Sequence, residues 1–378
     1  MNKITNVKIF NGEDFIQKGT VVFENGKITD ILDIEISSDE NTFDGKGMLL
    51  APGFIDIHIH GGAGHDVMDK SVDGIKEICS HLAKNGTTSF LATTVTYDLD
   101  ETNESLKCVL KAKEDNMGAD IIGVHLEGPF LNIEKKGAQN GKYIINPTID
   151  AYEKITKDCK DLVKRVTIAP ELDGSMEFIR YLADKGVCVS IGHTCADFDT
   201  FEEGIKNGAN LCTHLFNGMN PFHHRNPGVV AAALYDDKAN VEMICDLIHL
   251  DKNTIKTVHK IKGAEKCCLI SDAMCASGLK DGQYALGGLD VYVKNGSARL
   301  EDGTLAGSII TMKDAVKNLI TKLKLPVTDV LNMASYNPAK IIGADKIKGK
   351  IAKNYDADFV LLDDNYDVCN VFVGGRKI

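Results

Sequence analysis

The chain has 378 residues, of which 43% are hydrophobic and 26% are charged, and its formal net charge is −11. This composition is typical of a globular protein with a large core and excludes a disordered chain. The acidic balance argues against a general nucleic-acid binder, so we expect no nucleic-acid partner.

The sequence also predicts a cytoplasmic location and no membrane partner. No apolar run approaches the roughly 18–20 residues of a membrane helix, and the first fifteen residues lack the apolar stretch of a signal peptide. The eleven cysteines are an odd number without a CxxC pair, which is typical of reduced thiols and not of a disulfide framework or a zinc knuckle.

Both ends of the chain are rich in β-strand patterns. The apolar and β-branched runs there are 5–10, 19–24, 358–362 and 370–373. Asn-Gly and Gly-Gly pairs beside them are turn signals. We therefore expect one small β-sandwich domain, built from residues 1–52 and 345–378.

The middle of the chain alternates between short apolar runs and segments of helical spacing, such as 72–82 and 176–182. The candidate strands are 54–59, 88–95, 121–126, 165–169, 187–191, 211–215, 241–247 and 267–270. Eight such β/α units within residues 53–344 predict an α/β fold of the (β/α)₈, TIM-like barrel type, with strands buried on both faces. A β-hairpin is expected at 290–304.

Polar side chains stand where the candidate strands end, the place at which barrels of this type carry the active site. These residues are His58, His60, Glu127, His193, His214, His249 and Asp272. His58 and His60 are two apart in a strand, so both side chains point to the same side. Imidazole and carboxylate groups suit zinc or iron, so the pattern predicts a divalent metal site.

Asp272 is the candidate general base. A carboxylate beside metal-activated water can accept its proton and pass it on to a leaving group. Two other interpretations remain open for Asp272, a further metal ligand or a helix cap.

Arg225 is the candidate phosphate ligand. It lies in a loop, 222–228, ahead of an apolar helix expected at 229–234. The guanidinium fork binds phosphate with two hydrogen bonds, and helix N-termini attract anions. The alternative is a solvated basic loop.

The order HxH, Glu, His, His and Asp along the barrel strands resembles the amidohydrolase superfamily, and APGFIDIHIHG is similar to its first-strand signature. More narrowly, HLEGPF, IGHT, THLFNGM and SDAM resemble the N-acetylglucosamine-6-phosphate deacetylases, over nearly the whole chain. The resemblance implies a hydrolase that removes the acetyl group from the 2-amine of a phosphorylated amino sugar.

The resemblance also implies roles for individual residues. Glu127, His193 and His214 match the core metal ligands, and Asp272 matches the catalytic acid/base. His58 and His60 match ligands of a second metal that only some members have, so one or two cations per subunit are expected. The implied substrate contacts are Ala138, Gln139, Asn217, Gly218, Arg225, Asp246, Leu247, Ile248, His249, Leu305, Ala306 and Gly307. Gln139 stands where some members have a histidine.

The family's phosphate-binding arginine reaches across from a neighbouring subunit, which implies a homodimer with Arg225 acting across its interface. Two alternatives remain. One is another amidohydrolase that acts on a cyclic or acyclic amide, although the fourth candidate strand does not end in the lysine that many of those use. The other is a non-catalytic scaffold, which should have lost ligands that this chain retains.

Overall fold

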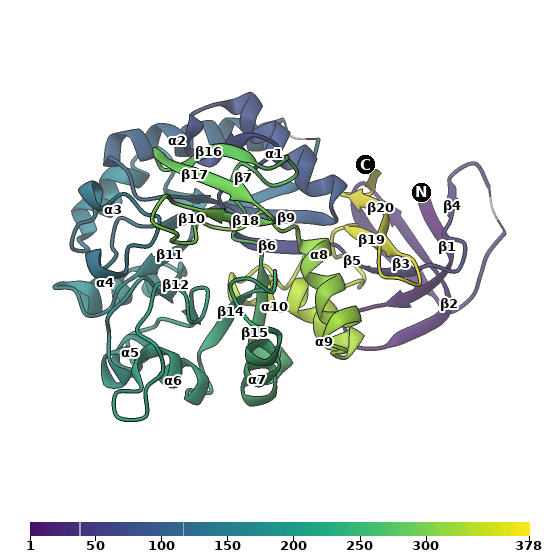
Figure 1. The fold of residues 1–378 in the computed structure, drawn as a ribbon. Helices are drawn as coiled ribbons and strands as arrows, with labels where there is room; N and C mark the ends of the chain where they lie inside the picture. Colours follow the sequence, from purple (N-terminus) through teal and green to yellow (C-terminus); the bar gives the residue numbers. More distant parts are fainter. Residues whose placement is uncertain (38, 116) are drawn as a thin grey trace.

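The computed structural model describes residues 1–37, 39–115 and 117–378. Figure 1 shows a large α/β barrel beside a smaller domain of strands, and both chain termini lie in the smaller domain. Strands from the two ends of the chain therefore meet in one small β domain, as the sequence predicts, and within it they form a single mixed sheet.

The smaller domain is one mixed sheet with the strand order β21-β20-β19-β5-β1-β2-β3, and β4 pairs with β1. Its strands are β1 Asn2–Phe10, β2 Phe15–Glu24, β3 Lys27–Leu32, β4 Thr42–Asp44, β5 Leu49–Pro52, β19 Phe359–Leu362, β20 Val368–Val373 and β21 Arg376–Lys377. β19 runs antiparallel to β5 and so joins the two ends of the chain. The rings of Phe23, Phe359 and Phe372 pack edge to face within a core of their own. We propose that these strands form a separate domain of residues 1–52 and 345–378.

The eight barrel strands are all parallel and follow the order β6-β9-β10-β11-β12-β13-β14-β15. They are β6 Phe54–Ile59, β9 Thr87–Thr94, β10 Asp120–Glu127, β11 Val163–Ile168, β12 Cys188–Ile191, β13 Leu211–Cys212, β14 Asn240–Ile244 and β15 Cys267–Ile270. Every residue of β6 and β9 is buried, as expected for strands covered on both faces. The predicted TIM-like barrel is thus confirmed.

Helices alternate with these strands and cover the outside of the barrel (Figure 1). They are α1 Val72–Lys84, α2 Leu99–Glu114, α3 Ile149–Thr156, α4 Ser175–Asp184, α5 Phe198–Lys206, α6 Gly228–Tyr235, α7 Lys252–Lys262, α8 Met312–Lys317, α9 Val327–Ala334 and α10 Tyr336–Ile341. α1 illustrates why they form where they do. Ser71 caps its N-terminus by accepting a hydrogen bond from the Gly74 amide, and Ile75, Ile78 and Leu82 are buried on one face.

The barrel closes between β15 and β6, next to the candidate site. The amide of Asp272 donates to the carbonyl of His58 at 2.9 Å, and the amide of His60 donates to the carbonyl of Ala273 at 2.9 Å. Below them the buried carboxylate of Asp56 accepts from the hydroxyl of Ser271. Backbone bonds therefore fix the relative positions of three candidate site residues.

A small antiparallel sheet follows β15 and lies over one side of the barrel (Figure 1). It consists of β16 Gly282–Leu286, β17 Leu289–Lys294 and β18 Ser297–Arg299. The hairpin predicted at 290–304 corresponds to β17 and β18, and β16 extends it. Within the described residues, no helix is long and apolar enough to span a lipid bilayer.

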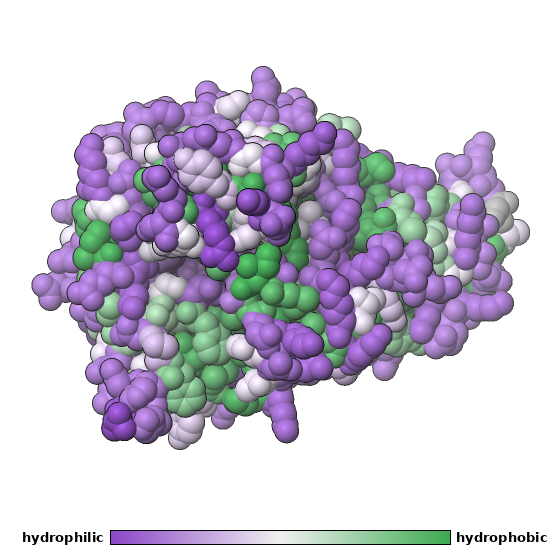
Figure 2. Space-filling view, viewed as in Figure 1, coloured by the Kyte–Doolittle hydropathy of each residue, from purple (hydrophilic) through white to green (hydrophobic). Residues whose placement is uncertain are grey.

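The face of the molecule seen in Figure 2 is mostly hydrophilic. Hydrophobic residues gather beside a hollow at its centre, over the region in which Figure 1 draws β14 and β15.

Candidate metal centre and active site

Three candidate site residues share one backbone geometry. His193, His214 and Asp272 each come two residues after the end of a strand, β12, β13 and β15. Each has a positive φ, at 48°, 27° and 49°. Residues other than glycine rarely adopt a positive φ, and backbone strain of this kind is concentrated at functional sites. Here it turns the three side chains over the end of the barrel.

Glu127, the last residue of β10, lies at the centre of the candidate ligands. Its Oε1 lies 3.1 Å from Nε2 of His214, 3.3 Å from Nε2 of His193 and 3.2 Å from Nε2 of His58. Its Oε2 lies 3.2 Å from Nε2 of His60. One carboxylate therefore contacts all four histidines, with a different oxygen for His60.

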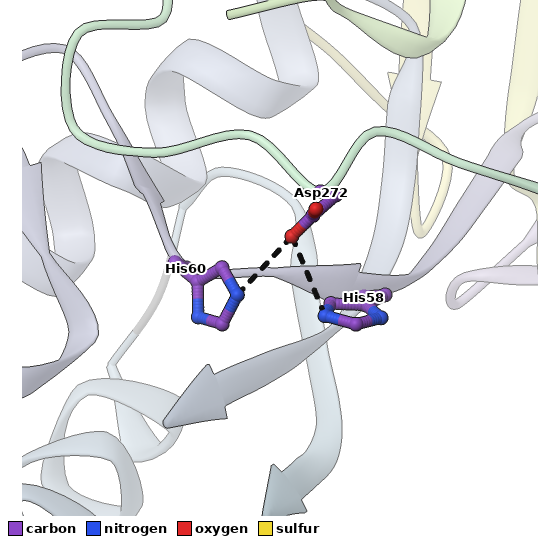
Figure 3. A group of neighbouring side chains, drawn as sticks. All are labelled: His58, His60 and Asp272. Carbon is purple, nitrogen blue, oxygen red and sulfur yellow. Dashed lines mark ion pairs between the residues drawn. The ribbon is translucent and has the colours of Figure 1, made fainter. Parts of the chain in front are cut away.

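The side chains form two groups that could each hold a cation: Glu127 with His193 and His214, and His58 with His60 and Asp272. The three ligand atoms of each group lie within 4.8 Å of one another, and all six residues are buried. Figure 3 shows His58 on β6 and His60 just beyond the end of that strand, with Asp272 entering from the loop above them. The Oδ1 atom of Asp272 lies 3.2 Å from Nε2 of His60 and 3.4 Å from Nε2 of His58.

The hydrogen bonds around the imidazoles fit metal binding. Nδ1 of His193 lies 2.7 Å from the carbonyl of Lys135, and Nδ1 of His214 lies 3.1 Å from the carbonyl of Asn217. A carbonyl can only accept, so these Nδ1 atoms carry the protons and the Nε2 atoms are left with lone pairs. Nε2 of His58 is buried and has no hydrogen-bond partner among the described residues. A cation ligated by these atoms would satisfy them.

The charges of the site also favour a cation. Burial alone would lower the pKa of His58, but the carboxylates of Glu127 and Asp272 raise it to about 9. Burial alone would raise the pKa of Glu127, but the imidazoles of His58 and His193 hold it well below its ordinary range. The two carboxylates thus attract positive charge to the point where the ligands meet.

Gln139 supports Glu127, although the sequence predicts it as a substrate contact. Its Nε2 donates to Oε2 of Glu127 at 2.7 Å, and its Oε1 accepts from the amide of Thr96 at 2.6 Å. Both polar ends of this buried amide are therefore used. The side chain still lines the cleft, so it can both orient the carboxylate and touch a ligand.

Below the ligands lies an ion pair that the sequence analysis misses. Arg165 of β11 and Glu242 of β14 are fully buried and contact each other. Oε2 of Glu242 lies 3.3 Å from Nδ1 of His58. The available signal is a charged residue among the apolar residues of each of two strand runs, with opposite signs in the two, since an unpaired charge would not be buried.

A cleft of about 310 Å³ opens above the metal-ligand candidates. The predicted substrate contacts that line it are Ala138, Gln139, Asn217, Gly218, His249, Leu305 and Gly307. Lining residues that the sequence analysis does not predict are Gly137, Phe216, Leu286 and Thr304. The small sheet that follows β15 thus contributes one wall through Leu286.

The other predicted contacts do not line this cleft. Ala306 is fully buried, next to Leu305 and Gly307. Asp246 accepts from Nδ1 of His249 at 2.7 Å, so it orients a residue that does line the cleft. Leu247 and Ile248 lie in the same turn, in which Leu247 has a φ of 67°.

Arg225 lies on an exposed loop outside the cleft of its own chain. Its guanidinium contacts the ring of His224 at 2.9 Å, and its amide contacts the ring of His223 at 3.3 Å. Within one chain, this arginine is therefore separate from the other predicted contacts.

Comparisons with known proteins agree with this geometry. Residues 49–378 match the amidohydrolase family. The chain is 39% identical to the N-acetylglucosamine-6-phosphate deacetylase of Bacillus subtilis (strain 168), over 97% of this chain and 94% of that protein. It is 37% identical to the enzyme of that name from Lysinibacillus sphaericus, over 99% and 96% of the two chains.

A solved structure, the N-acetylglucosamine-6-phosphate deacetylase of Thermotoga maritima, superposes with a TM-score of 0.89. It is 36% identical and covers 99% of both chains. The match extends over the barrel and the two-ended sheet together. The chain therefore belongs to the amidohydrolase family and, within it, to the N-acetylglucosamine-6-phosphate deacetylases.

Proposed function

We propose that the protein hydrolyses N-acetyl-D-glucosamine 6-phosphate to D-glucosamine 6-phosphate and acetate. The observation that carries this proposal is Glu127 in contact with four histidines, with Asp272 beside two of them. Amide hydrolysis needs activated water and a group that moves a proton to the leaving amine, and this cluster offers both.

We propose that Glu127, His193 and His214 hold one divalent cation and that His58, His60 and Asp272 hold a second. Zinc or iron is the expected metal, because the donors are imidazole and carboxylate groups. Such a cation, when bound, would polarise the amide carbonyl and lower the pKa of water. Because Glu127 contacts members of both groups, it is the residue that would link the two sites.

Asp272 carries the proton in this mechanism. Its carboxylate accepts a proton from the attacking water as the new C–O bond forms at the acetyl carbon. It then donates that proton to the nitrogen as the C–N bond breaks, which releases a neutral amine and acetic acid, and the acid ionises to acetate in solution. The amide of Asp272 donates to the carbonyl of His58 at 2.9 Å and its carbonyl accepts from the amide of Ser308 at 2.7 Å, so the backbone keeps the carboxylate in one place through both transfers.

The remaining cleft residues bind and orient the sugar. His249 is oriented by Asp246 and faces the cleft, where its imidazolium form would donate to the developing oxyanion. The backbone at Asn217 and Gly218 lies in the same wall and would contact the phosphate. Ala138, Gln139, Leu305 and Gly307 complete the contact surface.

We further propose a homodimer in which Arg225 reaches the phosphate of the neighbouring subunit's substrate. Two facts support this: the guanidinium is exposed, and it lies outside the cleft of its own chain. A cytoplasmic location is consistent with the eleven cysteines, which all lie within the described residues and form no disulfide.

The test is acetate release from N-acetylglucosamine 6-phosphate, from its galactosamine epimer and from unphosphorylated N-acetylglucosamine, with metal content measured on the same sample. We expect the phosphorylated glucosamine derivative to be the best substrate and turnover to stop on chelation. Equal rates with and without the phosphate would refute the assignment of a phosphate site. A metal-free, inactive protein with an intact fold would favour the scaffold alternative.

A further inference from the structure

Glu242 lies directly behind the ring of His58, on the side away from the cleft. Its Oε2 lies 3.3 Å from Nδ1 of His58 and also accepts from the amide of His214 at 3.1 Å. Its Oε1 contacts the guanidinium of Arg165. Glu242, Arg165 and the His58 side chain have no exposed surface.

Arg165 is held so completely that it has no freedom to turn. Its Nη1 donates to Glu242 and to the carbonyl of Ile57 at 3.1 Å. Its Nε and Nη2 both donate to Ser190 at 3.2 Å, and Nη2 also donates to Thr213 at 3.2 Å. All five N–H groups of the guanidinium are thus used, which fixes Oε1 of Glu242 and leaves Oε2 facing His58.

We propose that Glu242, anchored by Arg165, is a positioning residue that fixes the tautomer and the ring of His58 for metal binding. A carboxylate can only accept, so Nδ1 of a neutral His58 carries the proton and Nε2 keeps its lone pair. Nε2 is the atom that faces Asp272 and Glu127. This inference rests on the proposed second cation at His58, His60 and Asp272.

The histidines of the site differ in what their Nδ1 atoms face. His193 and His214 each point Nδ1 at a backbone carbonyl, which any sequence supplies. His58 points Nδ1 at a side chain instead, and Nδ1 of His60 has no partner among the described residues. Of the two histidines in the second group, only His58 is therefore oriented from behind within the described part of the chain, and Glu242 does it.

Glu242→Gln tests the proposal with almost no change of shape. The amide has one acceptor oxygen, and the charged guanidinium of Arg165 competes for it more strongly than the neutral amide of His214, so the NH₂ group turns toward Nδ1 of His58. Nδ1 must then accept, and the proton moves to Nε2, where it blocks ligation. Loss of such an outer partner typically weakens metal binding by 10–100-fold.

The assay titrates the metal-free protein with Zn²⁺ against a competing chelator and counts the sites by elemental analysis. We expect wild type to bind two Zn²⁺ and Glu242→Gln to bind the second one 10–100-fold more weakly. In ¹⁵N-histidine NMR of the zinc-loaded protein, the buried Nδ1–H signal of His58, assigned with His58→Asn, should be lost in Glu242→Gln.

Asp358→Asn is the matched control. Asp358 is also a buried carboxylate paired with a buried cation, Lys348 at 2.8 Å, but it lies in the segment that leads into β19. We expect it to lower the melting temperature and to leave both zinc affinities and the His58 signal unchanged. If Glu242→Gln does not fold, the double variant Arg165→Met/Glu242→Met removes the pair without leaving a lone charge and should still lose the second zinc.

The outcomes separate this inference from the proposed function. Wild-type zinc affinity at both sites in Glu242→Gln or in the double variant, or an unchanged His58 Nδ1–H signal, would overturn the role of Glu242. Equal weakening of both sites would make Glu242 a general structural residue. A wild-type protein that binds fewer than two Zn²⁺ would instead refute the proposed two-cation centre.

Discussion

Replacement of Asp272 by asparagine is the sharpest test of the mechanism. Asparagine has nearly the same shape and can still form hydrogen bonds, but it cannot take up a proton at neutral pH. The backbone of Asp272 is held independently of its side chain, since its amide donates to His58 and its carbonyl accepts from Ser308 at 2.7 Å. The fold should therefore survive the substitution.

The size of the effect follows from what the carboxylate contacts. Among the described residues, its charged partners are His58 and His60, and no backbone amide donates to it. Loss of general acid–base catalysis lowers kcat by roughly 10²–10⁴-fold, or about 2.7–5.4 kcal/mol at 1.36 kcal/mol per tenfold. We expect the upper end, because one carboxylate serves both proton transfers.

Three measurements on Asp272→Asn distinguish the possible roles: kcat, bound metal and melting temperature. A proton carrier predicts a large loss of kcat with most metal and stability retained. A residue that is mainly a ligand predicts loss of the second cation and partial rescue by added metal. Wild-type kcat would remove Asp272 from the mechanism and leave the attacking water without a base.

Further predictions concern the metal, the phosphate and the junction of the two domains. His193→Ala should lose one cation and nearly all turnover. His58→Ala should lose less activity if the cation held by Glu127, His193 and His214 suffices for catalysis. Full metal content and activity in His193→Ala would refute the proposed metal ligands. Arg225→Ala should raise KM for the phosphorylated sugar by the factor that corresponds to about 1.5–3 kcal/mol of lost binding free energy, and it should hardly change turnover of the unphosphorylated sugar. Equal losses of activity on both sugars would contradict the phosphate role. Lys348→Met leaves the buried carboxylate of Asp358 unpaired and should lower the free energy of unfolding by about 3–5 kcal/mol in urea titrations. The carboxylate partners of Lys348 hold its pKa above the unfolded value of about 10.4, although burial alone would lower it. The stability that Lys348 contributes is therefore complete below a pH of about 10.4 and is lost as the pH rises further. In urea titrations above a pH of about 10.4, the free energy of unfolding should decline in wild type and decline less in Lys348→Met.

The barrel could be predicted from the sequence because its strands carry a local signal. β6 was expected at 54–59 and occurs at Phe54–Ile59, and β15 was expected at 267–270 and occurs at Cys267–Ile270. β13 is shorter than expected, because the positive φ of His214 ends the strand at Cys212. A conformation imposed by the site thus overrides local strand propensity.

Side-chain contacts between residues far apart in the sequence have no local pattern from which they could be predicted. Gln139 is twelve residues from Glu127, and Arg165 is 77 residues from Glu242. Their pairing depends on the register and stagger of several strands, which a single sequence does not reveal. The ligand set was accessible because each ligand stands at a strand end, whereas its supporting residues lie wherever the barrel brings an acceptor or a donor.

The interior of the barrel argues that the Arg165–Glu242 pair serves the site more than stability. Desolvation cancels much of the attraction in a buried ion pair, and well-packed apolar residues often do as well or better. Apolar side chains are available for such packing, since Ile57, Leu211 and Ile244 of the neighbouring strands are buried together in one cluster. The pair nevertheless stands where it contacts the ring of His58 and the amide of His214. Like the positive φ angles after β12, β13 and β15, it is a local cost that the rest of the core offsets so that the ligands stay in place.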